Sequence, residues 1–417
     1  MKKTLIFFTL LVLVAFPTIA QTESTNNVVG KNYKYYSKVL DEETTLQIYT
    51  PKNYLESDKV YPVLYVMDSQ EYFLQAVAHQ DMLRFKDYSP EFIVVGIKTD
   101  RQQRRQLLYR DSKKFTAYLN EEIVPYIDNN FRTLKEKIRI YFGWEMSGGF
   151  GLELLGNKES IFSDFILASP SHITEYRIDT IQDKLKKNSL NINSVYVSMA
   201  SEEYFIEDEF KAVSKLFEGQ KRLDSKAIFK VFNEETHYTT PNKTMHNGLL
   251  KVFQDYIPLR RFSLKEYDDF GDLKAIRNYY KQRGERYSID TNIGESTIHF
   301  LIYYSMNEDN YKRFELYIDT FDDYLKTEIA RDFWYDRFAQ YFVKNNKLDK
   351  ALKIYKTGLN KFPNSSLLNH EIGNTYKLQG ELKNAENHYK KAIVLAKKND
   401  DSELINYEKS LKYLKTK

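Results

Sequence analysis

Short, nearly all-apolar runs recur along the first 253 residues of the chain, at 63–67, 92–97, 138–142, 165–168, 195–199 and 228–232. A strand that is buried on both faces has this composition, because helices cover both sides of a parallel sheet. The stretches between the runs have helical periodicity, and in one of them Phe115, Leu119, Ile123 and Ile127 recur every four residues. This alternation predicts a doubly wound, mostly parallel α/β domain that closes near Phe253.

The pattern changes on both sides of this domain. Residues 21–32 are polar and predict a loose leader, whereas the alternating stretch from Tyr33 to Tyr49 predicts a hairpin at the edge of the sheet. Beyond Pro258 the strand signals stop, and the chain has helical periodicity to its end. We therefore expect the α/β domain over 33–258, a helical connector or degenerate repeats over 259–330, and an all-α array of repeats with a capping helix over 331–417.

Two segments of the helical region align at an offset of 34 residues. The aligned pairs share a size class: Phe338 with Ile372, Ala339 with Gly373, Phe342 with Tyr376, Leu348 with Leu382, Ala351 with Ala385, and Tyr355 with Tyr389. This register resembles the tetratricopeptide repeat, a helix–turn–helix unit whose small residues lie at close helix crossings. The resemblance implies either a groove for a protein or peptide partner or an appendage that only packs. Two units are few for an array, so residues 262–330 and 401–414 are expected to cap it or to form degenerate repeats.

The first twenty residues have the pattern of a secretory signal peptide. Lys2 and Lys3 precede an apolar run from Leu5 to Phe16, and small residues precede a predicted cut after Ala20. The run is too short for a comfortable membrane span. We therefore expect an exported protein, periplasmic or secreted, with no membrane span after cleavage.

Charge and composition exclude several classes of function. The chain has 62 basic and 58 acidic residues, well mixed, which gives no reason to expect nucleic acid as a partner. It has no cysteine, so disulfides, thiolate zinc sites and thiol nucleophiles are ruled out. The histidines, among them His79, His172 and His246, show no metal-ligand spacing with carboxylates, and no glycine-rich phosphate loop occurs. The sequence therefore predicts no metal and no cofactor.

One motif lies where a strand is expected to pass into a helix. A nucleophile on such a sharp turn has the pattern Gly-x-Ser-x-Gly, because the flanking positions must be small. Here the strand is expected to end at Phe142, and Gly143-Trp144-Glu145-Met146-Ser147 follows. In this register Glu145 occupies the nucleophile position and Ser147 the second small position. The rival register makes Ser147 the nucleophile, but it places Glu145 where a small residue is required.

Residues from about 60 to 253 resemble the esterase family of α/β hydrolases that includes ferric-siderophore (enterochelin-type) esterases and S-formylglutathione hydrolase. The resemblance rests on the ordered segments 61–68, 93–101, 115–133, 139–148 and 235–253. It implies an α/β-hydrolase fold and a small-molecule carboxylic ester as ligand. It also implies a site with His237 as general base, Glu203 (alternatively Glu202) as its acid, and oxyanion donors on the backbone of Met146 and Ser69. Trp144 departs from the family pattern and would remodel the pocket floor, and the basic cluster of Arg101, Arg104 and Arg105 either meets an anionic ester or lies on a solvated loop. Ser69 stands where the family has glycine.

The glutamate at the nucleophile position leaves three alternatives open. A carboxylate has no proton to give His237 and could instead pair with it, which would raise the pKa of the histidine. The domain is then a binding module on a hydrolase scaffold, or Glu145 is itself a carboxylate nucleophile, or esterase activity persists through Ser147. Removing the serine of such a triad costs about a million-fold in kcat. Ordinary serine-esterase turnover is therefore not expected.

Overall fold

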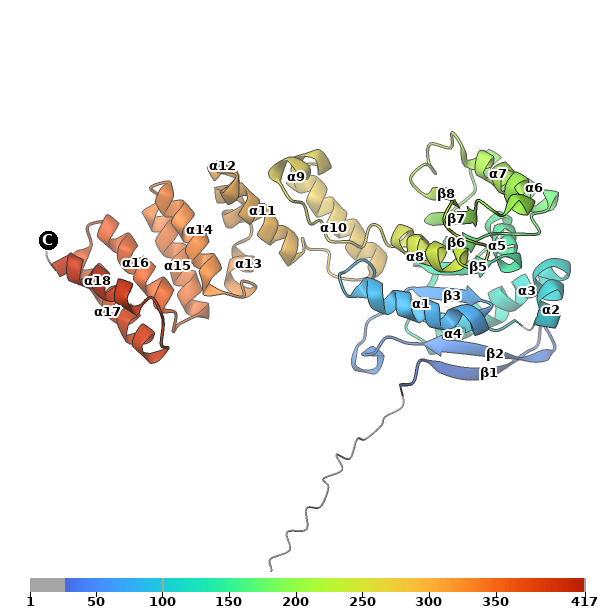
Figure 1. The fold of residues 1–417 in the computed structure, drawn as a ribbon, viewed down its shortest axis with the longest axis horizontal. Helices are drawn as coiled ribbons and strands as arrows, with labels where there is room; N and C mark the ends of the chain where they lie inside the picture. The colour runs from blue at the N-terminus through green and yellow to red at the C-terminus, as the bar shows by residue number, and fades with distance from the viewer. Residues whose placement is uncertain (1–26, 100, 416–417) are drawn as a thin grey trace, which may run out of the picture.

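The chain folds into an α/β domain followed by a long row of helices. The computed structural model describes residues 27–99 and 101–415. The α/β domain lies at one end of an elongated molecule, and the helices extend from it to the C-terminus at the other end (Figure 1). Within the described residues, no helix combines the length and apolar character needed to cross a membrane. The predicted signal peptide lies outside the described residues.

An eight-stranded sheet with the order β1-β2-β4-β3-β5-β6-β7-β8 forms the centre of the α/β domain. The strands are β1 (Lys31–Ser37), β2 (Glu42–Tyr49), β3 (Val63–Met67), β4 (Ile93–Ile97), β5 (Arg139–Trp144), β6 (Asp164–Ala168), β7 (Ser194–Ala200) and β8 (Ala227–Phe232). β1 and β2 form the predicted antiparallel hairpin, β2 pairs antiparallel with β4, and the remaining pairs are parallel. The predicted mostly parallel α/β fold is confirmed.

β5 is longer than the sequence analysis expected. Gly143 and Trp144 pair with Leu167 and Ala168 of β6, so β5 continues two residues beyond Phe142. The sequence pattern did not show this extension, because Gly and Trp are not part of the apolar run and only their pairing with β6 makes them a strand. The turn into the following helix therefore begins at Glu145.

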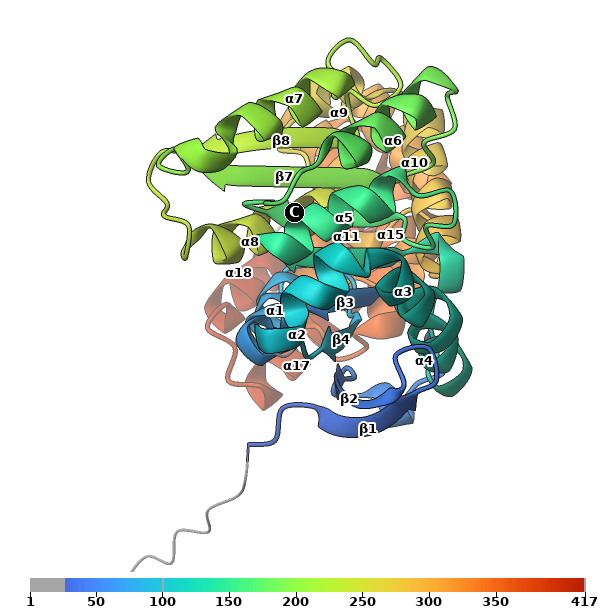
Figure 2. The ribbon, with the colours of Figure 1, turned by 90° about the vertical axis from the view of Figure 1, so that its right-hand side faces the viewer.

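Helices cover both faces of the sheet (Figure 2). α1 (Ser69–Arg84) and α8 (Thr240–Val252) pack on one face, against side chains such as Leu64 and Val66 of β3. The intervening residues of β3, Val63 and Tyr65, face the other side and a larger apolar core. That side is covered by α3 (Ser112–Ala117), α4 (Val124–Asn130), α5 (Met146–Gly156), α6 (Glu175–Lys186) and α7 (Glu207–Phe217). Burial on both faces accounts for the all-apolar runs.

The helical stretch predicted around residues 115–127 is not one regular helix. A π-helical segment, η3 (Tyr118–Ile123), connects α3 to α4, and a second one, η2 (Gln106–Arg110), follows α2 (Arg101–Arg105). The wider turns still bury Phe115, Leu119, Ile123 and Ile127 in the core. Single π turns inside helices are frequent at functional sites. Short 3₁₀ turns complete the domain: η1 (Tyr54–Glu56), η4 (Lys135–Lys137) and η5 (Tyr204–Ile206).

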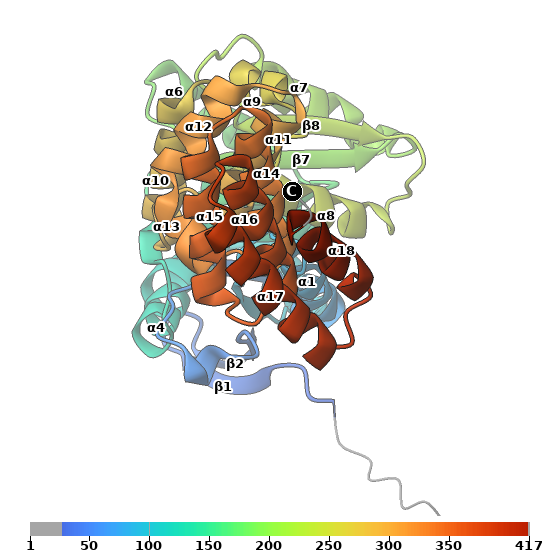
Figure 3. The same ribbon diagram turned by 90° about the vertical axis from the view of Figure 1, so that its left-hand side faces the viewer.

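Beyond residue 263 every regular element of the described chain is a helix (Figure 3). These are α9 (Leu264–Phe270), α10 (Leu273–Tyr287), α11 (Glu295–Asn307), α12 (Tyr311–Thr320), α13 (Asp322–Thr327), α14 (Asp332–Lys344), α15 (Leu348–Lys361), α16 (Ser366–Leu378), α17 (Leu382–Lys398) and α18 (Leu404–Lys415). α14/α15 and α16/α17 are the two aligned units. At Gly373 an added Cβ would lie 2.6 Å from the ring of Tyr389, so the small residue permits the close crossing of α16 and α17. The helical array fits the predicted repeats, and their tetratricopeptide character stays a prediction.

The end of α10 joins the helical array to the α/β domain. Tyr287 is buried in the apolar core between α1 and α8, where its ring lies 6.2 Å from that of Phe253. Its hydroxyl donates to Asp255 Oδ1 at 2.6 Å, and Arg286 Nη1 donates to Asp255 Oδ2 at 2.6 Å. Arg286 also lies 3.9 Å from Asp164, a fully buried carboxylate that accepts hydrogen bonds from Ser194 and Ser163. Apolar packing and ion pairs thus fix α10 on the domain.

Truncation of Tyr287 is expected to loosen this junction. Tyr287→Ala removes a large buried ring and should lower the free energy of unfolding by about 3–5 kcal/mol. Tyr287→Phe keeps the ring and loses only the hydrogen bond to Asp255, so about 1.5–3 kcal/mol is expected. Urea unfolding followed by tryptophan fluorescence measures both, because the two tryptophans, Trp144 and Trp334, lie one in each part of the chain. Equal losses in the two variants would show that packing of the ring does not hold the junction.

Candidate active site

Glu145 occupies a strained turn between β5 and α5. Its backbone has φ 55° and ψ −114°, a conformation that residues other than glycine rarely adopt. Its N–H donates to Ala168 O, and its carbonyl accepts from the N–H groups of Gly149 and Ser171. These bonds hold the turn in its conformation, at the carboxyl ends of the parallel strands.

The neighbours of this turn have to be small. An added Cβ at Gly143 would lie 2.5 Å from Ser147 O, and one at Gly149 would lie 1.8 Å from Ser171 O. Both contacts are with backbone, which cannot move aside without breaking the turn. The small-residue requirement that the motif expressed is therefore a real steric limit of this structure.

Two helix N-termini come together at this edge of the sheet, each preceded by a carboxylate. Glu145 is the N-cap residue of α5, and Asp68 is the N-cap residue of α1. The first helical residues are Met146 and Ser69, whose backbone N–H groups belong to the unpaired first turn of each helix. Negative charge is stabilised at such termini by the helix dipole. The two predicted oxyanion donors thus lie at the N-termini of α1 and α5.

Arg104 of α2 bridges the two carboxylates. Its Nε and Nη2 donate to the two oxygens of Asp68 at 2.9 and 3.0 Å, and its Nη1 donates to Glu145 Oε2 at 2.5 Å. Nη2 also donates to Trp144 O at 3.0 Å. Burial by itself would lower the pKa of Arg104, but the two carboxylates outweigh it and raise this pKa further. Glu145 is therefore paired with Arg104, whereas a pairing with His237 had been considered from the sequence.

Ser147, the rival nucleophile, is fully buried in the first turns of α5. Its hydroxyl oxygen lies 2.8 Å from both Asp68 Oδ2 and Trp144 O, to either of which its one proton can be donated, and it accepts from Trp144 N at 2.9 Å. The bond to Asp68 connects the turn to the N-terminus of α1. Asp68 also accepts a hydrogen bond from Thr99.

His237 and Glu203 form a paired dyad beside the turn. His237 Nδ1 is hydrogen-bonded to Glu203 Oε1. The second oxygen of Glu203 accepts from Ser169 Oγ at 2.8 Å and from Ala200 N at 2.5 Å, and the side chain is fully buried. Glu202, the alternative acid, accepts from the backbone N–H of His237 at 3.2 Å. The structure therefore brings Glu203, rather than Glu202, to the histidine ring.

Aromatic side chains surround the histidine. The Trp144 ring lies 4.8 Å from that of His237, and its Nε1 donates to His237 O at 3.1 Å. Tyr238 and Phe205 lie 5.2 and 5.9 Å from the His237 ring and are 81% and 58% exposed. Tyr204 adjoins Phe205 and is also exposed. We call Trp144, Tyr204, Phe205 and Tyr238 the aromatic rim. Sequence analysis had singled out only Trp144 from this group.

A second histidine lies on the loop that follows β6. His172 has φ 55°, its Nδ1 is 2.9 Å from Ser171 Oγ, and its ring packs against Tyr109. Burial lowers the pKa of His172, and the charge of Glu145 opposes this shift. The sequence analysis assigned no role to His172, because nothing in the sequence indicates that its loop folds beside the turn at Glu145.

The remaining predicted residues lie as follows. Ser69 begins α1, and its Cβ lies against Gly96, where an added Cβ would be only 2.6 Å away. Gly96 thus makes room for a serine in place of the glycine that the family has. Arg101 begins α2, but its side chain lies outside the described residues, and the guanidinium that reaches the turn is that of Arg104. Over 27–99 and 101–415 no group of three or more His, Asp or Glu side chains is placed to hold a metal ion.

Comparisons with known proteins found several that are similar to this chain. Residues 37–238 match a family described as "Putative esterase". "Uncharacterized protein YjcH" of Bacillus subtilis is 30% identical over 152 residues, which cover 34% of this chain and 63% of that protein. A crystal structure of an uncharacterised protein from Capnocytophaga ochracea superimposes with a TM-score of 0.51 and 15% identity, over 93% of this chain and 99% of that chain. An IroE-like serine hydrolase from Shewanella oneidensis gives a TM-score of 0.49 at 18% identity, over 70% and 98%.

The fold and the family match together define the class of protein. The α/β domain of this chain belongs to the esterase family of α/β hydrolases. The matched segment spans less than two thirds of the Bacillus relative, and that relative is itself uncharacterised. The match with the Capnocytophaga structure extends over the helical array as well, so the combination of the two parts recurs in another protein.

A double-mutant cycle is expected to show the strength of the Arg104–Glu145 pair. Arg104→Ala leaves two carboxylates without their cation and should lower the free energy of unfolding by about 3–5 kcal/mol. With Glu145→Ala and the double variant, urea unfolding should give a coupling energy of roughly 0.5–3 kcal/mol. Arg105→Ala, an exposed neighbour on the same helix, is the matched control and should change stability by less than about 0.5 kcal/mol. Equal small losses for Arg104→Ala and Arg105→Ala would contradict the pairing.

Proposed function

We propose that the α/β domain binds a small ester-like molecule and has lost serine-esterase turnover. The observation that carries this proposal is Glu145 on the nucleophile turn, paired at 2.5 Å with Arg104. Serine attacks an ester because a histidine takes its proton. An ionised carboxylate has no proton to transfer, so the His237–Glu203 dyad has nothing to activate at this position.

The pairing with Arg104 argues further against attack by Glu145. A charge-assisted hydrogen bond from a guanidinium stabilises the ionised carboxylate and withdraws its electron density. Attack of a carboxylate on an ester carbonyl would also give an anhydride, a less stable product than the ester consumed. The bond to Arg104 and the instability of the anhydride both disfavour attack by Glu145 on an ester carbonyl. The turn therefore supports binding better than acyl transfer.

Ser147 is a poor substitute for the missing serine. Its hydroxyl is fully buried and takes part in bonds to Asp68 and Trp144. A nucleophile must reach both the ligand and a base, and this hydroxyl faces the end of α1 instead. The location of Ser147 supports the register in which it is the second small residue of the turn.

The aromatic rim supports a ligand with a planar apolar part. Tyr238, Phe205 and Tyr204 are exposed, and such a cluster of exposed aromatic side chains suits a ligand site. Trp144, Phe205 and Tyr238 lie around the His237 ring, and Tyr204 adjoins Phe205. An aromatic ring of a ligand could stack on this rim beside the nucleophile turn. We therefore propose a small aromatic ester or ester-like molecule.

One observation favours a second reading. The dyad of His237 and the fully buried Glu203 is completely formed, although a binding site does not need it. In this reading Glu145 attacks a saturated carbon of the ligand, the leaving group departs with the bonding electrons, and water deprotonated by His237 cleaves the resulting ester of Glu145. Arg104 would then have to move away from Glu145 before attack.

Ester hydrolysis by three variants separates these readings. The wild-type protein is expected to hydrolyse p-nitrophenyl acetate and butyrate no faster than the solution background. Glu145→Ser restores a hydroxyl beside the dyad and should raise the rate by roughly 10²–10⁴-fold. His237→Ala in the Glu145→Ser background should abolish the gain. Ser147→Ala in the same background should retain it, because Ser147 is not the attacking residue.

Other outcomes would overturn the binding proposal in identifiable ways. Wild-type turnover that disappears in His237→Ala but survives Ser147→Ala would make Glu145 a nucleophile. Turnover that disappears in Ser147→Ala would make Ser147 the nucleophile. Binding itself is measured with phenyl acetate by quenching of Trp144 in a Trp334→Phe background, where Trp144 is the remaining tryptophan. Tyr238→Ala should weaken this binding, and absence of quenching in the parent would remove the ligand proposal.

Export and a protein partner also belong to the proposal, and both rest on sequence patterns. The mature protein is expected to begin at Gln21 and to reside in the periplasm or outside the cell, which N-terminal sequencing of the purified native protein tests. The repeats over 331–417 are expected to hold a protein partner. Cross-linking of the full chain in its native compartment should then place that partner on these residues, and cross-links confined to the α/β domain would contradict this.

A further inference from the structure

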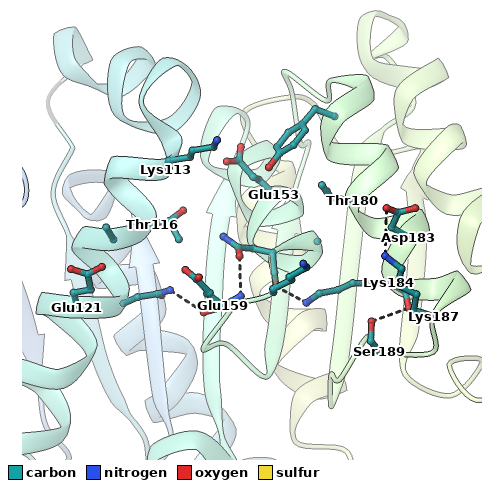
Figure 4. A pocket seen from close by; sticks show the side chains of 16 residues that line it. Lys113, Thr116, Glu121, Glu153, Glu159, Thr180, Asp183, Lys184, Lys187 and Ser189 are labelled. Carbon is teal, nitrogen blue, oxygen red and sulfur yellow. Dashed lines mark hydrogen bonds and ion pairs between the residues drawn. The ribbon is translucent and has the colours of Figure 1, made fainter.

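A cavity of about 630 Å³ lies on the α/β domain, separate from the nucleophile turn. Figure 4 shows Lys113, Thr116 and Glu121 on one wall and Thr180, Asp183, Lys184 and Lys187 on the opposite wall, with Glu153 of α5 between them. Its volume lies within the range of small-molecule sites. Glu153 follows Glu145 by eight residues, which is about 12 Å along the helix axis. The cavity is therefore a different place from the aromatic rim.

The charges around the cavity balance. Four lysines and four carboxylates line it. Glu153 is paired with Arg177 at 2.9 Å, and Lys187 with Asp183 at 4.0 Å. The amine of Lys184 is half-buried and donates to Asn157 O at 2.5 Å, and burial lowers the pKa of Lys184. A strongly anionic or strongly cationic ligand gains no net attraction from such a lining.

One buried acceptor at the cavity has no partner. Asn120 Nδ2 donates to Glu159 O at 2.9 Å, but Asn120 Oδ1 is buried without a hydrogen bond in the structure. A buried polar atom without a partner is destabilising by about 1–3 kcal/mol, and rotation of the Asn120 side chain toward the cavity would let its amide bond to a ligand. Asn120 belongs to the π-helical segment η3, whose wide turn departs from the regular helix beside the cavity.

An aromatic ring completes the lining. Tyr176 on α6 borders the cavity and is 57% exposed. Its face can cover the apolar C–H face of a pyranose ring, and its hydroxyl can bond to the ligand's edge. Ser189 and Thr180 add hydroxyl groups to the same wall. The lining thus combines one aromatic surface with closely spaced donors and acceptors.

We infer that this cavity binds a neutral sugar, of the size of a mono- or disaccharide. Each sugar hydroxyl is both donor and acceptor, which matches a lining that holds both ammonium groups and carboxylates. The neutral ligand suits the equal numbers of lysines and carboxylates, its hydroxyls suit the amide of Asn120, and its ring face suits Tyr176. The inference does not depend on the function proposed for the nucleophile turn, because it uses none of the residues of that site.

The site also has a physical connection to the loop beside the turn. Arg177, fully buried, donates through Nε to Glu153 Oε2 at 3.0 Å and through Nη1 to His172 O at 3.0 Å. A third bond joins its Nη2 to Leu108 O in the π-helical segment η2. The same guanidinium therefore braces the floor of the cavity and the loop of His172.

Calorimetric titration of the full chain with maltose, cellobiose and N,N′-diacetylchitobiose tests the inference. At least one of these should bind with a dissociation constant of about 1 mM or tighter. Tyr176→Ala should weaken that binding about tenfold, and Asn120→Ala should weaken it as well. Tyr176→Phe, which keeps the ring, should retain most of the affinity. Tyr204→Ala, an exposed tyrosine on the aromatic rim, is the matched control and should leave it unchanged.

Several results would overturn the inference. These are the absence of binding by all three disaccharides at millimolar concentration, affinity that Tyr176→Ala leaves intact, and an equal loss in Tyr204→Ala. Binding of only citrate, spermidine or glycylglycine would assign the cavity to an anion, a cation or a zwitterion instead. Thermal unfolding of each variant shows that it is folded, and a Tyr176→Ala protein that unfolds early is replaced by Tyr176→Ser for the same titration.

Discussion

Arg104 holds two carboxylates at the point where two helices begin, and the geometry of the site depends on this contact. Asp68 precedes α1 and Glu145 precedes α5, and the guanidinium bonds to both side chains and to Trp144 O. Without the cation, two negative charges would face each other in a half-buried place, which is unfavourable. With it, Glu145 can occupy this strained backbone position with its charge balanced by the guanidinium.

The same site holds a second bonded pair. His237 is bonded to Glu203, which is itself held by Ser169 and Ala200 N. These bonds also satisfy a fully buried carboxylate, so they stabilise the fold whether or not the histidine acts on a ligand. The pair can therefore be present with or without catalysis. The family match covers the scaffold and does not by itself assign chemistry to this site.

The two parts of the chain form one continuous structure. Tyr287 and Arg286 at the end of α10 enter the core and the ion pairs of the α/β domain, so the helical array begins at a fixed place. Within the α/β domain, Arg177 links the lysine- and carboxylate-lined cavity to the loop of His172. Buried or half-buried guanidinium groups therefore recur where separate elements of this protein meet. Their planar set of donors can bond to several fixed acceptors at once, which suits a residue that joins separate elements.

Much of the fold and part of the site could be predicted from the sequence. Apolar runs indicate strands because the strands of a parallel sheet are buried on both faces, and the requirement for small neighbours placed Glu145 on the turn. His237 followed from the resemblance to the esterase family. Other features were decided only by tertiary structure. The sequence does not distinguish Glu203 from the adjacent Glu202, or Arg104 from the neighbouring arginines. Only the folded chain shows that Glu203 reaches the His237 ring and that Arg104 reaches Glu145. The extension of β5, the aromatic rim and the cavity beside Asn120 arise from segments far apart in the chain, so their contacts do not exist until the sheet has assembled.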